Sequence, residues 1–318
     1  MRPAPTQPWA GVVARSPAMQ QVRELVQRLA ESRAAVLIEG ESGTGKDLVA
    51  WWLHALGPRR DGPFLRVHGP SIPEELAESD LFGHERGAFT DAQRTKLGKL
   101  ELASGGTLYL DQLQDLSPAL QAKLLRVVEE CRFERLGGTR SIEVDLRFVS
   151  SSNVDLRSAA AEGRFREDLF HRLGVVPLRL PPLRERVEDL LPLAELFLAR
   201  ERERGTTAAS AFEDEAVAAL RAYGWPGNVR ELRTAVERAA LYAGTAERVP
   251  FSALPPQVTA QPGALWAGRE RRPTLRDVER SYIRFVLDDV EQSQTRAATI
   301  LGISRKALWE KRRRYGMP

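Results

Sequence analysis

Gly40-Glu41-Ser42-Gly43-Thr44-Gly45-Lys46 is the stretch that decides the fold of this chain. It follows a short apolar run, residues 34–38, and precedes residues 47–53, whose pattern predicts a helix. A glycine-rich turn between a strand and a helix can cradle phosphate, because its backbone N–H groups point at one anion. The helix N-terminus and the charge of Lys46 add to that attraction. The alternative is a connecting loop that binds nothing, but this spacing favours nucleotide binding.

The composition is that of an ordinary soluble protein. The chain has 318 residues, 42% hydrophobic and 28% charged, which is long enough for two or three domains with a sizeable core. No apolar run approaches the length of a membrane span, and the N-terminus lacks the apolar core of a signal peptide. The single cysteine, Cys131, fits a reducing compartment, so we expect a cytoplasmic protein. The histidines show no metal-ligand spacing, which makes a metal site built from side chains alone unexpected.

Positive charge is concentrated at the C-terminus. The whole chain has a net charge of +4, but residues 304–318 alone carry six basic residues and one acidic residue, Glu310. The rest of the chain is therefore slightly negative. Such an uneven distribution predicts a basic arm or a DNA-reading element at this end.

Further strands are predicted to complete the phosphate site. Residues 63–68 form a second strand, and residues 105–113 form a third that ends on an acid, Asp111. An apolar strand that closes on Asp downstream of a phosphate loop predicts a ligand for hydrated Mg²⁺. A fourth strand, residues 144–151, ends near Asn153, which either contacts the γ-phosphate or its attacking water, or is only a turn residue.

The alternation of strands and helices predicts an α/β fold with a mostly parallel sheet covered on both faces. Residues 163–173 are expected to form a helix that carries several arginines, which either have a function or form a solvated face. Residues 175–180 are expected to form a fifth strand. Three helical segments follow, at residues 188–204, 213–222 and 227–242, and predict a small α-helical domain. Residues 244–273 have the composition of a linker.

The last segment has the pattern of a helix-turn-helix. A helix is predicted from Thr274 to about Val290, then a short one over residues 295–301, a turn at Gly302, and a final helix capped by Ser304. The final helix carries the basic cluster, so contacts to phosphates and base edges are both available to it. The alternative is an amphipathic cap with solvated charge. The residues expected to meet DNA are Ser304, Arg305, Lys306, Trp309, Lys311, Arg312 and Arg313.

These motifs in this order resemble the NtrC-type bacterial enhancer-binding proteins, which are AAA+ activators of transcription by sigma-54 RNA polymerase with a Fis-type helix-turn-helix. The resemblance runs from about residue 11 to the C-terminus. It rests on GESGTGK (40–46), LFGHERGAFT (81–90), GGTLYLD (105–111), FREDLFHRL (165–173), LPPLRER (180–186) and WPGNVREL (225–232).

The resemblance implies an AAA+ P-loop NTPase with a parallel sheet, a small α-helical lid and an all-α C-terminal domain. The implied divisions are a tail at residues 1–10, an ATP-binding subdomain at 11–180, a lid at 181–248, a linker at 249–273 and a DNA-binding domain at 274–318. It also implies a ring, often a hexamer, that remodels the closed promoter complex after binding an enhancer-like DNA site. We expect no sensory domain before residue 11, so control would come from a separate regulatory protein, a ligand or expression level.

The resemblance also assigns roles to individual residues. ATP would be held by Gly40, Glu41, Ser42, Gly43, Thr44, Gly45, Lys46 and Asp47, with Arg230 as the sensor II arginine. Asp111 would serve Mg²⁺ through water, and Asn153 would be the sensor I residue. Arg166 and Arg172 match arginine fingers that reach the γ-phosphate of a neighbouring subunit. The loop that touches sigma-54 would be Gly87, Ala88, Phe89 and Thr90, where an aromatic residue at a loop tip is typical of a partner contact and the alternative is a surface loop.

Three departures from the family pattern lie on the chemistry. Gln112 stands where the family has the Glu that polarises the attacking water, and Gln cannot accept its proton. His68 replaces the Asn that switches that Glu, and Asp91 replaces the second Gly of the sigma-contacting loop. Two hypotheses follow: an ATP-dependent sigma-54 activator that tolerates these changes, or a DNA-binding regulator that uses ATP only as an assembly ligand. The second would act as a repressor, independently of sigma-54, or as a partner in a mixed ring.

Overall fold

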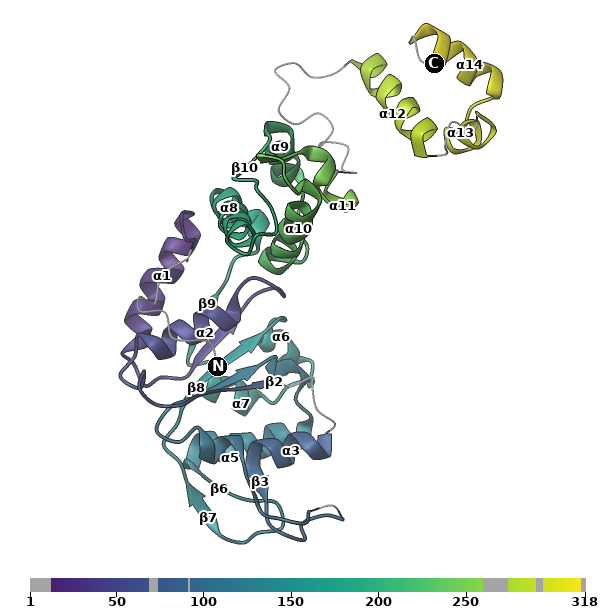
Figure 1. Ribbon diagram of the computed structural model, residues 1–318. Helices are drawn as coiled ribbons and strands as arrows, with labels where there is room; N and C mark the ends of the chain where they lie inside the picture. The colour runs from purple at the N-terminus through teal and green to yellow at the C-terminus, as the bar shows by residue number, and fades with distance from the viewer. Residues whose placement is uncertain (1–12, 69–73, 91, 260–273, 290–293, 316–318) are drawn as a thin grey trace.

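The computed structural model describes residues 13–68, 74–90, 92–259, 274–289 and 294–315. Its centre is a five-stranded parallel sheet with the strand order β2-β5-β8-β1-β9 (Figure 1). The strands are β1 (Val36–Glu39), β2 (Phe64–His68), β5 (Thr107–Asp111), β8 (Arg147–Ser152) and β9 (Val176–Arg179). These are the five strands predicted from the apolar runs, and the predicted α/β class is confirmed.

The register of the sheet brings its polar strand ends together. His68 at the end of β2 pairs with Asp111 at the end of β5, and Glu39 at the end of β1 pairs with Ser152 in β8. Because all strands run in the same direction, the loops that leave their carboxyl ends gather at one edge. The glycine-rich loop leaves β1 at this edge, so the predicted phosphate site lies there.

Helices cover both faces of the sheet, as the nearly continuous apolar strands require. On one face lie α1 (Pro17–Ala30) and α2 (Lys46–Ala55), which pack against side chains such as Ile38 and Tyr109. On the other face α5 (Pro118–Glu130) and α7 (Glu167–Leu173) pack against neighbours such as Leu37 and Leu108. Successive strand residues thus enter opposite cores. The other helices of this second layer are α3 (Glu74–Phe82), α4 (Lys99–Leu102) and α6 (Leu156–Ala161).

The predicted helix over residues 163–173 is wrong in its first half. Gly163 has φ +72 and its N–H bonds to the carbonyl of Ala160, which ends α6. The chain re-enters a helix only at Glu167, with Arg166 in an extended conformation as the N-cap of α7. A left-handed glycine terminates a helix in this way because no Cβ penalises the conformation. Arg166 and Arg172 therefore stand at opposite ends of one short helix.

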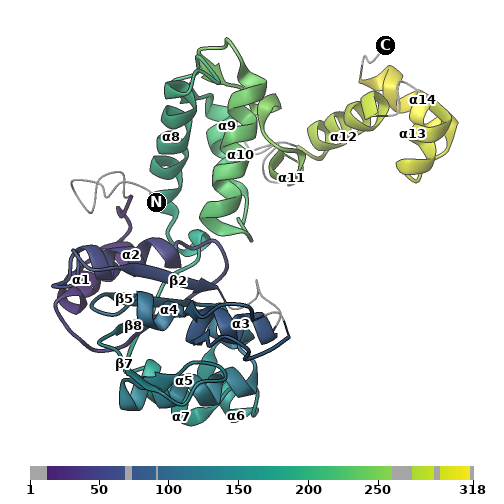
Figure 2. The ribbon, with the colours of Figure 1, turned by 60° about the horizontal axis from the view of Figure 1, so that its bottom comes forward.

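The lid is a separate helical layer around a buried tryptophan. It consists of α8 (Val187–Glu203), α9 (Asp214–Ala222), α10 (Asn228–Ala243) and α11 (Pro256–Thr259), with the short parallel pair β10 (Ala211–Phe212) and β11 (Arg248–Val249). Helices α8 and α10 lie side by side (Figure 2), and Trp225 is among the largest fully buried side chains.

The predicted linker begins later than expected. Val249, Ala253, Leu254 and Val258 are buried in the core of the lid, so residues 249–259 belong to it. The Pro and Ala content of this stretch suggested a linker, but its apolar residues close the end of the helical layer. Residues 260–273, the remainder of the predicted linker, lie outside the described part of the chain.

Two antiparallel pairs and the C-terminal helices complete the description. The pair β3 (Gly83–His84) and β4 (Lys96–Leu97) flanks the predicted sigma-contacting loop, and β6 (Arg132–Glu134) with β7 (Ser141–Glu143) forms a hairpin around Gly137-Gly138. The C-terminal helices are α12 (Leu275–Asp289), α13 (Gln294–Ile300) and α14 (Arg305–Arg314), which share a small apolar core. The predicted cap is confirmed, since the Ser304 side chain accepts a hydrogen bond from the N–H of Ala307 at 3.1 Å.

One buried arginine joins the ends of two helices. The Arg147 guanidinium donates to the carbonyl oxygens of Leu29 at 2.6 Å and of Ala30 and Leu53 at 2.8 Å, at the C-termini of α1 and α2. Burial lowers the pKa of Arg147 to about 10, so the side chain stays charged at neutral pH. It satisfies carbonyl groups that a helix end leaves without partners.

We expect Arg147→Met to destabilise the protein by about 3 kcal/mol, because each buried acceptor left unpaired costs about 1–3 kcal/mol. The measurement is the urea midpoint of unfolding compared with the wild type. Arg164→Met is the matched control, since Arg164 is exposed and pairs with the equally exposed Glu162. Equal midpoints for both variants would contradict this role of Arg147.

Candidate nucleotide-binding site

The glycine-rich loop folds around the ammonium group of its own lysine. Lys46 Nζ donates to the carbonyl oxygens of Gly40 at 2.6 Å and Glu41 at 3.0 Å, and to Asn153 Oδ1 at 2.6 Å. Gly43 and Gly45 have φ +81 and φ +109, conformations that glycine adopts at no steric cost. Burial lowers the pKa of Lys46 below its ordinary value. The predicted phosphate lysine and the predicted sensor residue at the end of β8 are thus in direct contact.

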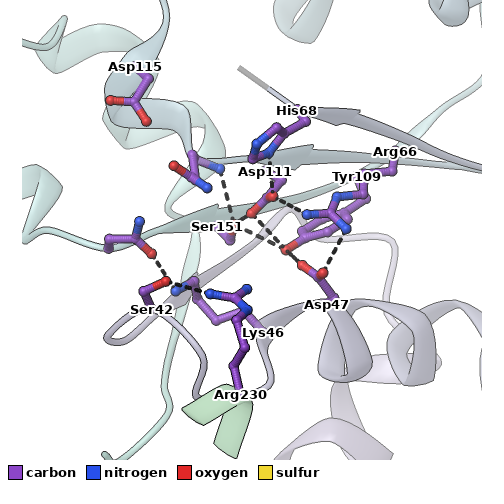
Figure 3. A network of polar contacts seen from close by, with 12 residues as sticks. Ser42, Lys46, Asp47, Arg66, His68, Tyr109, Asp111, Asp115, Ser151 and Arg230 are labelled. Carbon is purple, nitrogen blue, oxygen red and sulfur yellow. Dashed lines mark hydrogen bonds and ion pairs between the residues drawn. The ribbon is translucent and has the colours of Figure 1, made fainter. Parts of the chain in front are cut away.

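Asp111 is the most heavily contacted acid at the sheet edge (Figure 3). Its Oδ2 lies 2.5 Å from Arg66 Nη2 and 2.8 Å from His68 Nδ1, and its Oδ1 lies 2.6 Å from Ser151 Oγ and 3.2 Å from the Tyr109 hydroxyl. Burial alone would raise the pKa of Asp111, but the hydrogen bonds from Ser151 and Arg66 outweigh it and hold that pKa below its usual range. Because the carboxylate only accepts, His68 must carry its proton on Nδ1.

Arg66 bridges two of the predicted site acids. Its Nη1 lies 2.7 Å from Asp47 Oδ2, while its Nη2 binds Asp111, so one guanidinium joins the first turn of α2 to the end of β5. The hydroxyl of Tyr109 lies 2.9 Å from Asp47 Oδ1, and the Arg66 guanidinium lies 5.9 Å from the Tyr109 ring centre. Burial, followed by the charge of Asp47, raises the pKa of Tyr109, so its hydroxyl remains a donor.

The donor set fits a hydrated Mg²⁺ only in part. Carboxylates such as Asp47 and Asp111 suit this hard cation. However, four polar groups surround the Asp111 carboxylate, two at each oxygen, so a metal-bound water must displace one of them. Among the residues that the structure describes, no group of three or more His, Cys, Asp or Glu side chains is arranged to hold a metal ion.

Gln112 follows Asp111 in an unusual backbone conformation. It has φ 60 and ψ 61, and its N–H lies 3.2 Å from Ser151 Oγ. A left-handed non-glycine residue is uncommon and marks a turn that the surroundings enforce. The turn ends β5 and places Gln112 beside the polar cluster. A neutral amide at this position cannot take a proton from water.

The lid is bonded directly to the phosphate loop. The N–H of Val229 donates to the carbonyl of Gly43 at 3.0 Å, and Arg230 Nη1 donates to Ser42 Oγ at 2.8 Å (Figure 3). A Cβ on Gly43 would lie 2.2 Å from the carbonyl oxygen of Gly227, so only glycine allows this approach. The predicted sensor II arginine therefore reaches the loop from the first turn of α10.

Further lid residues hold the loop from the outside. Asn228 Nδ2 donates to the carbonyl of Ser42 at 3.0 Å and to Glu41 Oε2 at 3.1 Å, while its Oδ1 accepts from the N–H of Leu183 at 2.7 Å. Arg184 forms a bidentate pair with Glu41, and this contact, aided by Asn228, lowers the pKa of Glu41 to about 2. The Arg186 guanidinium donates to the carbonyl of Thr44 at 2.8 Å.

The two predicted finger arginines lie at the two ends of α7, apart from the contacts around Lys46. Arg166 pairs with Asp168 at 2.7 Å, and Arg172 pairs with Glu129 at 3.0 Å. Both side chains are exposed, with 45% and 60% of their surface accessible. Because they are exposed, both guanidinium groups can contact a second molecule. An arginine finger that reaches the nucleotide of a neighbouring subunit must have this exposure.

The predicted sigma-contacting loop is a compact turn with an exposed aromatic residue. Gly87 has φ +83 and its N–H donates to the carbonyl of Ala92 at 2.8 Å. Phe89 packs edge-on against the His84 ring at 4.9 Å but remains 40% exposed. Thr90, next in the chain, is also exposed, and a Cβ on Gly137 would contact Ala88, so the loop lies against the β6–β7 hairpin. Asp91 lies outside the described residues.

The predicted DNA-reading helix exposes most of its basic side chains to solvent. Arg305, Lys306 and Arg313 are exposed, Arg312 is half-buried, and Trp309 is exposed with the Arg313 guanidinium 5.6 Å from its ring centre. Lys311 differs, because its ammonium pairs with Glu279 on α12. This pairing links the final helix to α12 and partly neutralises Lys311 for contact with phosphate.

The fold and site define a P-loop NTPase with a helical lid, followed by a helix-turn-helix unit. Comparisons with known families agree: the Sigma-54 interaction domain matches residues 12–179, the AAA+ ATPase lid domain matches residues 184–265, and the bacterial regulatory protein, Fis family, matches residues 274–315. The chain belongs to the sigma-54-dependent, NtrC-type family of DNA-binding transcriptional regulators.

Individual relatives support this assignment. The regulatory protein AtoC of Escherichia coli (strain K12) is 42% identical over 97% of this chain and 68% of its own length. The Nif-specific regulatory protein of Azospirillum lipoferum is 51% identical over 72% of this chain, but the match spans only 36% of that relative. The crystal structure of NtrX from Brucella abortus in complex with ATP is similar at 36% identity with a TM-score of 0.73, over 96% of this chain and 70% of that one.

Sequence reasoning missed Arg66 and the outer lid contacts. Arg66 stands two residues before His68, so both side chains leave β2 on the same face, next to the strand that ends at Asp111. That spacing could have indicated the contact of Arg66 with Asp111.

No helix among the described residues is long and apolar enough to cross a membrane.

Proposed function

We propose that this chain binds ATP at residues 40–46 and, in the ATP-bound form, acts on the closed promoter complex of sigma-54 RNA polymerase. The observation that carries the proposal is the contact of Lys46 Nζ with Asn153 Oδ1 at 2.6 Å, close to Asp111 and Arg230. A buried cation that contacts both the glycine-rich loop and the end of a neighbouring strand can bind a phosphate there. The ATP held by the similar NtrX protein agrees with this assignment.

We infer that the active form is a ring, with Arg166 and Arg172 directed to a neighbouring subunit. Both arginines are exposed and lie on a helix separate from the Lys46 site. Arginines supplied by a second molecule stabilise the charge of phosphoryl transfer. Phe89 and Thr90 would then meet sigma-54 from the exposed loop, and α14 would hold the DNA. We propose a hexamer, which is the ring size that the resemblance to the family implies.

Hydrolysis is expected to be slow. Lys46, Asn153 and Arg230 can bind and position phosphate, but Gln112 offers no base for water, and His68 is engaged with Asp111. A second candidate function follows from this observation: a regulator in which ATP serves assembly and is not turned over. Mg²⁺ would accompany ATP at Asp111 and Asp47, where it would supply positive charge to the phosphates.

Transcription in vitro from a sigma-54 promoter separates the two functions. An activator that needs hydrolysis gives open complexes with ATP and none with a non-hydrolysable analogue. A regulator that needs only bound nucleotide gives the same effect with both. Failure to bind ATP would contradict the proposal as a whole.

A further inference from the structure

One of the two negative charges around Asp111 is offset by the protein itself. Two carboxylates, Asp47 and Asp111, face the phosphate loop, and Arg66 contacts both, at 2.7 Å and 2.5 Å. The Asp111 side chain is only 5% exposed, so water screens its charge poorly. Lys46 is occupied by two loop carbonyls and Asn153. Arg66 is thus the cation in direct contact with this acidic pair, and it offsets one of the two negative charges.

The two carboxylates that Arg66 joins are also the groups that would hold a divalent ion through water. A metal ion beside a nucleotide commonly offsets the negative charge of the phosphates and of the carboxylates that hold its waters. Here a guanidinium spans the two carboxylates, and His68, Ser151 and Tyr109 surround the rest of Asp111. Asp47 is held in turn by the Tyr109 hydroxyl at 2.9 Å.

We propose that Arg66 is a resident counter-cation of the Asp47–Asp111 pair, so that this protein binds metal-free ATP almost as tightly as it binds MgATP. The inference rests on the proposed ATP binding and specifies the ligand form that the site accepts. Without Arg66, two carboxylates would repel the phosphates unless a divalent ion intervened. With Arg66, the ion has to compete with a guanidinium that is already bonded to both carboxylates.

Calorimetric titration of the full chain with ATP, in excess Mg²⁺ and in EDTA, tests the proposal. The wild-type dissociation constants are expected to agree within about threefold, since a unit charge that offsets one of the two carboxylates is already present. Arg66→Met keeps most of the side-chain volume but removes the charge, and it should weaken binding in EDTA by about tenfold or more while MgATP binding changes less. Arg66→Lys should restore most of the binding in EDTA.

Arg60→Met is the matched control, because Arg60 precedes the same strand, is 67% exposed and has Asp61 as its ion-pair partner, at 3.7 Å. The proposal is overturned if the wild type binds ATP about a hundredfold more weakly in EDTA, or if Arg66→Met leaves the ratio of the two constants unchanged. The ratio of the wild-type dissociation constants in EDTA and in Mg²⁺ tests the proposal even if Arg66→Met does not fold. A wild type that binds ATP under neither condition overturns the proposed function itself, whereas steep dependence on Mg²⁺ overturns only the role of Arg66.

Discussion

Gln112→Glu is expected to raise the steady-state ATP turnover of this protein by about tenfold or more. The substitution places a carboxylate directly after Asp111, in the turn that ends β5. A positioned general base contributes about 10²–10⁴-fold to a reaction, and part of that gain should return even though His68 keeps its contact with Asp111. The measurement is phosphate release at saturating ATP.

Gln27→Glu makes the same chemical change on the exposed face of α1 and should leave turnover unaltered. The affinity for ATP, measured separately, should change much less than turnover in Gln112→Glu, because the introduced carboxylate would activate water and is not part of the phosphate loop. Robust turnover in the wild type that Gln112→Glu leaves unchanged would show that another group activates water.

Lys46→Ala is expected to weaken ATP binding by about a hundredfold or more. The variant loses the buried charge and the three hydrogen bonds that join Gly40, Glu41 and Asn153. Hydrogen bonds to charged groups contribute about 1.5–3 kcal/mol each, and loss of one or two toward phosphate accounts for the expected change. Isothermal titration with ATP gives the dissociation constant.

Lys306→Ala is the control for Lys46→Ala, since Lys306 is exposed on the C-terminal helix α14. It should bind ATP like the wild type while weakening DNA binding. A thermal unfolding curve without nucleotide establishes that Lys46→Ala is folded. Unchanged ATP affinity in a folded Lys46→Ala protein would place the nucleotide somewhere other than the glycine-rich loop.

The sequence predicted the sheet and the loop because both are encoded locally. Short β-branched runs, the spacing of Gly43, Gly45 and Lys46, and an acid at the end of an apolar strand are all visible within a few residues. The contact of Lys46 with Asn153 was not predicted, although it agrees with the rule that parallel strands end at one edge. Those features need no knowledge of how distant helices pack.

Contacts between distant segments were harder to predict. Arg66 looked like one more charged residue in a half-buried strand, and its role depends on Asp47 and Asp111 reaching it from two other elements. The pair of Arg184 with Glu41 joins residues 143 positions apart. Local pattern also misplaced the start of α7, since the helical spacing of arginines hid the left-handed Gly163.

The central claim is that the chain holds ATP firmly in a site that turns it over slowly. The most direct test is the turnover number of the wild-type protein, measured at an ATP concentration that titration shows to saturate the site. We predict full occupancy with turnover at least about a hundredfold below the value of about 1 s⁻¹ at the low end of ordinary enzymes. A saturated site with turnover of about 1 s⁻¹ or faster would contradict the claim.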